Sequence, residues 1–198
     1  MQPEEQALVK ALHGGDQDAC RELIDQYGGQ IYGVALRLMR NPDEAEDVLQ
    51  ETFIDACNAV SDFEARSSLG TWLYRIATNN SLMRLRRPDD PTVPLDAPEL
   101  TEPADLPQQL NAWPGAPEEM FLNDELRQHL EVAIDDLPDA LRPAFVLRDI
   151  EGLSTREAAE VLGITSGALK VRLHRARLQL RESLADYFQE TEPVGGER

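Results

Sequence analysis

The sequence predicts an all-α protein: two small helical domains joined by a flexible, acidic, proline-rich linker. Apolar residues recur every three or four residues over most of the chain, which is the period of an amphipathic helix. Eight prolines and no basic residue lie between residues 88 and 117, so neither a helix nor a strand is expected there. We therefore expect a first domain over residues 1–87, the linker over 88–117, a second domain over 118–188 and a disordered tail over 189–198.

The charge of the chain is strongly acidic but uneven. It has 19 Lys and Arg against 37 Asp and Glu, and more than half of the net charge of −18 falls in residues 88–125. Because phosphate neutralisation drives nonspecific nucleic-acid binding, this balance argues against a general nucleic-acid coat. Two segments are nevertheless basic, so we expect weak DNA binding by the chain alone and a need for a partner.

The sequence also limits location and chemistry. No run of about 18 apolar residues could span a membrane. The first residues carry acids where a secretory signal has Lys or Arg, so we expect a cytoplasmic protein without membrane insertion. Cys20 and Cys57 are isolated and are interpreted as small core residues, and the three histidines are scattered, so neither a metal site nor a cofactor is predicted.

Three helices are expected at the start of the first domain. A short helix ends at Gly14-Gly15, and Asp16 can cap a long amphipathic helix. Asn41-Pro42 then supplies a cap and a proline at the first helical position, which starts a third helix. One side of that helix is polar and mostly acidic, with Glu46, Asp47, Gln50 and Glu51. On pattern alone a solvated surface is favoured over a docking surface for a basic partner.

The last helix of the first domain combines arginines, amides and aromatics. Residues 65–88 hold five Arg and no acid, and Ser67 or Ser68 can cap the helix. Asn79 and Asn80 are poor helix formers but can hydrogen-bond base edges, and Trp72 could stack on a base or belong to the core. Such a segment fits single-stranded or melted DNA.

The second domain contains a helix-turn-helix pattern. An apolar stripe over residues 122–137 is followed by a helix from Pro138, in which Pro143 predicts an irregular first turn. Ser154 and Glu157 then form a capping box, and Gly163 fits the left-handed residue that ends a helix. The next helix has a buried stripe, five basic residues and no acid up to Arg181, which favours a recognition helix in the major groove over a solvated helix.

Together these segments resemble a bacterial RNA polymerase sigma factor of the extracytoplasmic-function group. The similarity lies in NPDEAEDVLQETF, FEARSSLGTWLYRIATNNSLMRLRR and the segment from LPDALRPAFVL to LHRARLQLRE, which occur in the family's order and spacing. It implies a non-enzymatic subunit that brings core polymerase to a promoter and helps to melt it. It also implies promoter DNA and the clamp helices of the polymerase's largest subunit as partners, with a cognate anti-sigma factor as a further one.

The resemblance assigns roles to individual residues. The implied polymerase contacts are Glu46, Asp47, Gln50 and Glu51. The implied contacts to the −10 element are Phe63, in a loop that captures a flipped base, with Asn79, Asn80 and Arg84. The implied contacts to the −35 element are Arg148, Lys170, Val171, Arg172, His174, Arg175 and Arg177, of which Arg172 and Arg177 are assigned to phosphates.

Two alternatives stay open on the sequence. An ordinary helix-turn-helix regulator would use the first domain for a ligand or for dimerisation, but the Arg- and Asn-rich helix speaks against it. An enzyme would need a glycine-rich loop or a nucleophile arrangement, and the sequence has neither. Asn80 departs from the apolar residue usual in the family and Val171 from a common polar one, so a base preference cannot be transferred.

Overall fold

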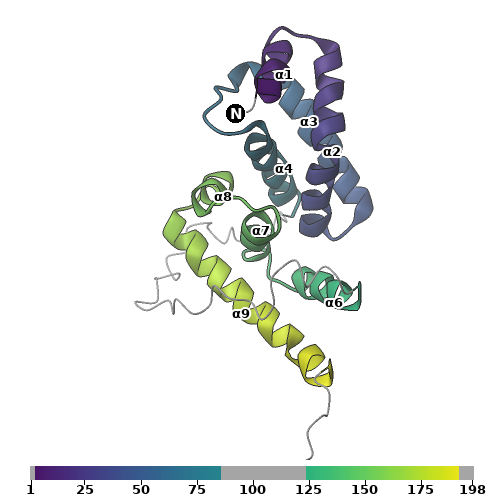
Figure 1. Cartoon of the computed structure of the whole chain (residues 1–198), viewed down its shortest axis with the longest axis vertical. Coiled ribbons are helices and arrows are strands. Elements are labelled where there is room, and N and C mark those ends of the chain that lie inside the picture. The colour runs from purple at the N-terminus through teal and green to yellow at the C-terminus, as the bar shows by residue number, and fades with distance from the viewer. Residues whose placement is uncertain (1–2, 86–123, 192–198) are drawn as a thin grey trace, which may run out of the picture.

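The computed structural model describes residues 3–85 and 124–191, and every regular element in these ranges is helical. The first domain comprises α1 (Pro3–His13), α2 (Gln17–Met39), α3 (Pro42–Ala59), the short 3-10 helix η1 (Val60–Asp62) and α4 (Leu69–Leu85). The second comprises α6 (Asp124–Asp135), α7 (Arg142–Phe145), the π-helical turn η3 (Val146–Ile150), α8 (Thr155–Leu162) and α9 (Ser166–Thr191). Figure 1 shows the two groups of helices stacked along the long axis. The predicted all-α class is confirmed.

The caps that the sequence predicts in the first domain are present. The Asp16 carboxylate accepts a hydrogen bond from the backbone N–H of Asp18 at 2.9 Å and starts α2. The Asn41 side-chain oxygen accepts from the N–H groups of Asp43 and Glu44 at 2.9 and 3.3 Å, with Pro42 at the first helical position. Between them Arg40 ends α2 in the left-handed conformation, with a φ of 58°. A two-residue turn therefore folds α2 and α3 into an antiparallel pair.

The second domain begins its central helix later than expected. Residues from Pro138 form a turn, in which the Pro138 carbonyl accepts hydrogen bonds from Leu141 and Arg142 at 2.8 and 3.0 Å, and α7 starts only at Arg142. Pro143 stands in its first turn, because a proline has no N–H to donate further along. The helix then widens into the π turn η3, so the predicted irregularity extends beyond Pro143.

The helix-turn-helix is formed as the sequence predicts. Ser154 and Glu157 make both bonds of the capping box, and Gly163 ends α8 with a φ of 65°. The stripe of Leu169, Leu173, Ala176 and Leu180 on α9 is at most 5% exposed. Helix α9 continues to Thr191, three residues into the segment that was predicted to be a disordered tail. The predicted linker lies outside the described residues.

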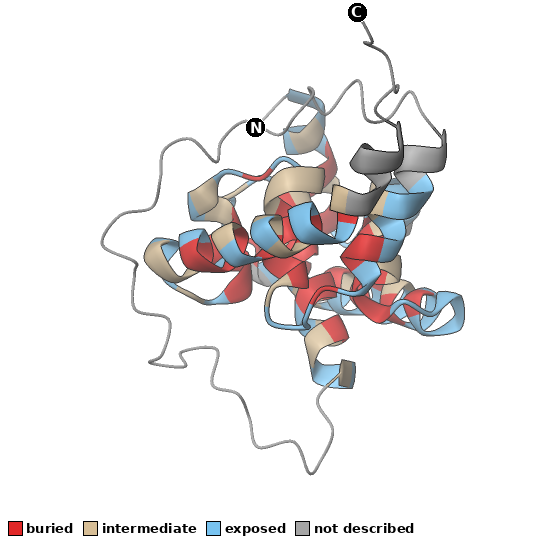
Figure 2. Ribbon diagram, turned by 90° about the horizontal axis from the view of Figure 1, so that it is seen from below, coloured by how far each residue is buried: buried red, intermediate tan, exposed pale blue. Residues whose placement is uncertain are grey.

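Apart from a small cluster of Ala35, Met39, Ala45 and Val48 between α2 and α3, most buried apolar residues of both domains form one connected cluster. It runs from Leu8 on α1 through Leu73 on α4 and Leu147 on η3 to Leu184 on α9. Figure 2 shows the buried residues in red along the inner sides of the helices and the exposed residues in pale blue. No helix in the described ranges is long and apolar enough to cross a membrane.

The interpretation of the two cysteines as separate core residues was wrong. Cys20 at the start of α2 and Cys57 near the end of α3 form a disulfide, with their Cα atoms 6.2 Å apart. Both are partly exposed. They are separated by 37 positions, and only the antiparallel pairing of α2 with α3 brings them together, so spacing alone could not reveal the pair.

Candidate nucleic-acid interface

The acidic face of α3, formed by Glu46, Asp47, Gln50 and Glu51, is exposed, although the side chains of Asp47 and Glu51 are only 60% and 48% exposed. The opposite side of the helix packs into the domain through Ala45, Val48, Thr52, Phe53 and Ala56. This separation follows from the helical period, which places the polar and apolar residues of α3 on different sides. Glu46 and Gln50 are therefore exposed to a partner, whereas Asp47 and Glu51 are ion-paired with Arg84 of α4.

Arg84 on α4 links the two predicted sets of contacts in the first domain. Its guanidinium donates to Glu51 at 2.5 and 3.2 Å and to Asp47 at 3.1 Å. The hydrogen bond with Glu51 is the main cause that raises the pKa of Arg84. Asn80 likewise donates to Asp55 of α3 at 3.0 Å. Of the residues predicted to contact the −10 element, Arg84 and Asn80 thus face α3, whereas Asn79 is exposed.

A small cavity lies between the loop before α4 and the first two turns of α4. Its volume is about 290 Å³, and its lining consists of Phe63, Glu64, Arg66, Ser67, Trp72 and Arg75. Phe63 is only 4% exposed and packs against Trp72, with ring centroids 5.1 Å apart and planes tilted by 44°. Trp72 is half-buried and Arg66 and Arg75 are exposed beside it. Arg66 is ion-paired with Glu64, which lines the same cavity.

Arg66 and Arg75 were not singled out from the sequence. The signal was present, because both belong to the acid-free segment with five arginines. What the sequence could not show is that the loop folds back and places Arg66 next to α4.

The residues of α9 that were predicted to contact the −35 element differ in their exposure. Lys170 and Arg175 are exposed and His174 is half-buried. Val171 and Arg172 are only 1% and 5% exposed, although both were predicted to contact the −35 element. The reason is that α9 packs against α6, α7 and α8 at once, so its buried side is wider than one stripe.

The other two predicted contacts lie at the base of the helix-turn-helix. Arg177 donates twice to the carboxylate of Asp149, at 2.8 and 2.7 Å, and this hydrogen-bonded pair raises the pKa of Arg177. Arg148, next to Asp149 on η3, is half-buried. The Arg177–Asp149 pair joins α9 to η3, so Arg177 already has a structural partner.

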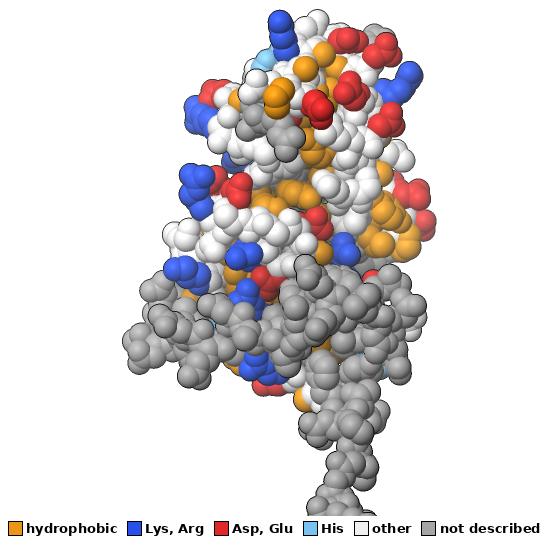
Figure 3. Space-filling model, viewed as in Figure 1, with side chains coloured by type: hydrophobic (Ala, Val, Ile, Leu, Met, Phe, Trp, Pro, Cys, Tyr) orange, Lys and Arg blue, Asp and Glu red, His pale blue; other side chains and the backbone are white. Residues whose placement is uncertain are grey.

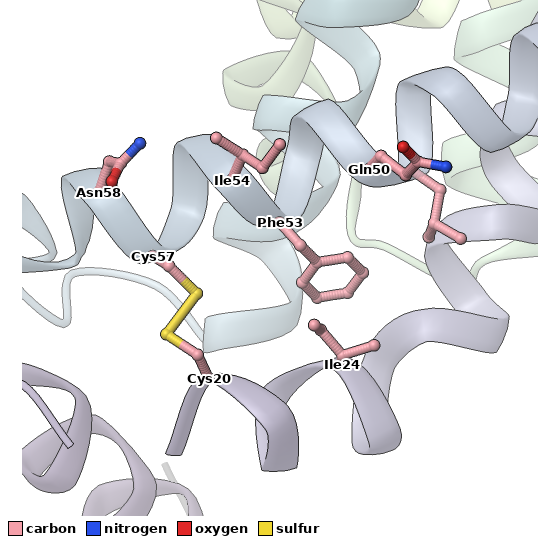
Figure 4. A pocket seen from close by; sticks show the side chains of 8 residues that line it. Cys20, Ile24, Gln50, Phe53, Ile54, Cys57 and Asn58 are labelled. Atoms are coloured by element: carbon pink, nitrogen blue, oxygen red, sulfur yellow. A yellow bond between two sulfur atoms is a disulfide. The ribbon is translucent and has the colours of Figure 1, made fainter. Parts of the chain in front are cut away.

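An apolar groove between α2 and α3 was not predicted. It has a volume of about 530 Å³, and Figure 4 shows Ile24 of α2 and Phe53 of α3 pointing toward one another in it, with the disulfide beside them. Ile54 is 60% exposed and follows the acidic face directly. Exposed apolar side chains beside a polar rim are typical of a protein–protein contact.

The charges are separated over the surface. In the orientation of Figure 3, acidic side chains line the right-hand edge of the first domain, over α2 and the start of α3, whereas Lys and Arg gather on the left-hand and lower side. In the ranges 3–85 and 124–191, no group of three or more His, Cys, Asp or Glu side chains could hold a metal ion.

These features are those of a helix-turn-helix protein with an exposed acidic face on α3 and a basic helix in each of two domains. Comparison with known families and proteins agrees. The profile of Sigma-70 region 2 matches residues 23–89 and that of Sigma-70, region 4 matches residues 127–180. The ECF RNA polymerase sigma factor SigW of Bacillus subtilis is 38% identical over 179 residues, covering 90% of this chain and 95% of SigW. The RNA polymerase sigma-H factor of Pseudomonas aeruginosa is 34% identical over 193 residues, covering 96% and 98%.

Two solved structures are similar over most of the chain. CnrH, in complex with the cytosolic domain of CnrY, has a TM-score of 0.63 and 26% identity, covering 92% of this chain and 97% of CnrH. The sigma factor RpoE of Bartonella quintana, in complex with the anti-sigma factor NepR, has a TM-score of 0.59 and 27% identity, covering 83% and 96%.

The chain belongs to the sigma-70 family of RNA polymerase sigma factors, in its extracytoplasmic-function (ECF) group. It directs promoter recognition by RNA polymerase and is not an enzyme. The resemblance stated from the sequence motifs is confirmed, and the alternative of an ordinary helix-turn-helix regulator is set aside.

Proposed function

We propose that this sigma factor docks on core RNA polymerase through the acidic face of α3 and reads two promoter elements with α4 and α9. The observation that carries the proposal is the exposure of Glu46, Asp47, Gln50 and Glu51 on a helix whose other side is buried. The partner on core polymerase would be the clamp helices of the largest subunit, with basic side chains that meet these carboxylates. Complementary charge would speed the encounter and fix its orientation.

At the −10 element, the cavity beside Phe63 and Trp72 would receive a base flipped out of the melted strand. The two aromatic rings would supply the stacking surface, and Asn79 would read an exposed base edge. Arg66 and Arg75 would neutralise phosphates of the same strand. Arg84 and Asn80 donate hydrogen bonds to carboxylates of α3. These bonds favour a supporting role, in which the two residues hold α4 against α3.

At the −35 element, the exposed Lys170 and Arg175, with His174 between them on the same side of α9, would enter the major groove. Arg148 would contact DNA just before the turn, and Arg172 and Arg177 would contact phosphates. Val171 and Arg172 are buried in this arrangement and Arg177 is paired. For these three residues a local rearrangement would therefore precede DNA contact.

We further propose regulation by an anti-sigma factor in the cytoplasm. The solved relatives CnrH and RpoE are in complexes with CnrY and with the anti-sigma factor NepR. For this chain, such a factor would cover the acidic face of α3 together with α4. The apolar groove with Ile24 and Ile54 lies beside that face and would add apolar area to the contact.

The first prediction is tested by run-off transcription with purified core polymerase on promoter DNA. Reversal of Glu46, Asp47 and Glu51 to Lys is expected to reduce promoter-specific transcripts at least tenfold, because three attractive contacts become repulsive. The matched control reverses three exposed acids of α2, Asp18, Glu22 and Asp25, and should retain transcription. Equal activity of the two triple variants would contradict docking through α3.

A further inference from the structure

Residues 63–68, which we call the capture loop, join η1 to α4 without regular secondary structure. The members of this loop that line the cavity are Phe63, Glu64, Arg66 and Ser67. In its middle, Ala65 has a φ of 56°, in the left-handed region that a residue with a side chain rarely adopts. Such a backbone conformation persists where the surrounding structure fixes it. The capture loop is therefore expected to have firm supports outside itself.

His13, the last residue of α1, supports the start of the capture loop. Its Nε2 lies 2.8 Å from the carbonyl oxygen of Val60, the first residue of η1. Because a carbonyl oxygen only accepts, Nε2 is the donor. The same oxygen accepts from the backbone N–H of Phe63 at 3.0 Å, which closes the turn before the loop. His13 therefore acts on the turn that places Phe63 in the wall of the cavity.

Glu5, in the first turn of α1, supports the other end of the loop. Its carboxylate accepts a hydrogen bond from the backbone N–H of Leu69 at 2.5 Å. Leu69 is the first residue of α4, and the first N–H groups of a helix have no partner within it and carry partial positive charge. Ser68 supplies a local cap, because its Oγ accepts from the N–H of Thr71 at 3.1 Å. Glu5 adds a second cap from 64 positions away and fixes where α4 begins.

Both supports belong to one short helix that is packed into the first domain. Between them lie the buried residues of α1, Leu8, Val9 and Leu12, which are at most 7% exposed. Glu5 and His13 are about 12 Å apart along the helix axis. Figure 1 shows the connection from α3 to α4 passing beside α1. A single packed helix thus holds the capture loop at both ends, and a displacement of either end would break a bond to α1.

We propose that Glu5 and His13 are positioning residues for promoter melting: they hold the capture loop in the conformation that receives the flipped base. The inference rests on the proposed base capture beside Phe63 and Trp72. It gives a role to α1, which precedes the segment matched by the region 2 profile, residues 23–89. Without either bond the loop would populate further conformations, and its apparent affinity for the base would fall with the fraction of loops that stay competent.

The test compares alanine with glutamine at both positions. Glu5→Ala and His13→Ala remove the two hydrogen bonds. Glu5→Gln keeps an acceptor oxygen and His13→Gln keeps an N–H donor, so both glutamine variants should behave close to the wild type. Glu4→Ala and Lys10→Ala are the matched controls, because each removes an exposed ionisable side chain from the same end of α1.

The functional readout is run-off transcription by the holoenzyme on two templates. One is the intact promoter, and the other has an abasic site in the non-template strand at the −10 position where such a site costs the wild type most. On the intact promoter, each alanine variant should raise the holoenzyme concentration for half-maximal transcription about three- to tenfold, the range of a single hydrogen bond. On the abasic template, where the loop has no base to hold, the variants should match the wild type. A general loss of stability would weaken both templates equally.

Amide hydrogen exchange in the free full-length protein measures the two supports directly. Glu5→Ala should speed exchange of the Leu69 amide, and His13→Ala that of the Phe63 amide, by about tenfold or more, because local opening becomes easier. The amide of Ala77, in the middle of α4, should keep its exchange rate in both variants.

The outcomes separate the two proposals. Alanine variants that transcribe like the wild type from the intact promoter, that lose activity equally on both templates, or that equal the glutamine variants would overturn the positioning role. A wild-type holoenzyme that is indifferent to abasic sites throughout the −10 element would instead count against base capture. The exchange rates would then decide by themselves whether Glu5 and His13 hold the capture loop.

Discussion

A disulfide joins α2 and α3, the two helices that line the apolar groove. Cys20→Ser removes the disulfide with Cys57 and is expected to lower the midpoint of thermal unfolding in buffer without reductant. A cross-link that closes a loop of 37 residues restricts the unfolded chain, and the entropy model gives about 3–4 kcal/mol for that length. Differential scanning calorimetry measures the difference.

Reductant supplies the control for the cysteine prediction. With excess dithiothreitol the disulfide of the wild type is reduced, so its midpoint of thermal unfolding should fall close to that of the variant. An equal difference in both buffers would assign the effect to packing of the thiol side chains and not to the bond.

Among single residues, Arg84 shows what the arginine-rich pattern of α4 cannot predict, namely its partners on another helix. A run of arginines without acids predicts a basic surface correctly, but it does not say which arginine pairs with an acid from another helix. Arg84 finds Asp47 and Glu51, which are 37 and 33 positions away. Arg66 and Arg75 belong to the same segment and line the cavity. Nothing in the sequence distinguishes these two arginines from the others in the segment.

At the scale of elements, α8 depends on its capping box. The Ser154 hydroxyl accepts from the N–H of Glu157 at 3.2 Å, and the Glu157 carboxylate accepts from the N–H of Ser154 at 2.9 Å. Ser154→Ala removes the first bond and is expected to lower the free energy of unfolding by about 1 kcal/mol at pH 7. Urea unfolding followed by circular dichroism measures this difference.

The cap also predicts a pH dependence. The hydrogen bonds with Ser154 hold the pKa of Glu157 below its usual value of 4.5. A carboxylate with a lowered pKa in the folded state stabilises the fold above its unfolded pKa, and this stabilisation is lost as the pH falls through the folded pKa. The cost of Ser154→Ala should therefore shrink between pH 5 and acid pH. A cost that is the same at pH 3 and pH 7 would show that the Ser154 hydroxyl does not lower the pKa of Glu157, because the bond from the backbone N–H of residue 154 to the carboxylate remains in the variant.

Elements with local causes were predictable, and elements with tertiary causes were not. Caps at Asp16, Asn41, Ser154 and Gly163 depend on neighbouring residues, and all four are present where predicted. The start of α7 was predicted four residues too early, because a proline pattern cannot distinguish a turn from a first helical turn. The burial of Val171 and Arg172 depends on three helices that surround α9, none of which is visible in the pattern of α9 itself.

For the whole molecule, the sequence predicted two domains but not their contact. Its hydrogen bonds join residues far apart along the chain: Tyr74 donates to Glu151, 77 positions away, and Arg142 donates to the carbonyl oxygen of Leu38, 104 positions away. From the sequence alone, each of these four residues is interpreted as an ordinary surface or helix residue. The hydrophobic period of a helix does not show that a side chain from another domain will cap it. The helix-turn-helix and the acidic face, by contrast, follow from spacing within single helices.

The continuous hydrophobic cluster has a consequence for how the protein unfolds. Two domains that share a buried interface lose it together, so the wild type is expected to melt in one calorimetric transition. Arg37→Glu removes the ion pair of Arg37 with Glu151 of the second domain, so this variant should split the melt into two. Two separate transitions in the wild type would show that the interface contributes little coupling.

Leu147→Ala, at a fully buried position of η3, is expected to lower the free energy of unfolding by about 2–5 kcal/mol. Because the two domains share a buried interface, this variant should destabilise both of them. The cooperativity makes the helix bundle that would dock on polymerase sensitive to damage in the domain that would read the −35 element. A chain with a defective DNA-reading half would then tend to be cleared by proteolysis before it could occupy polymerase unproductively.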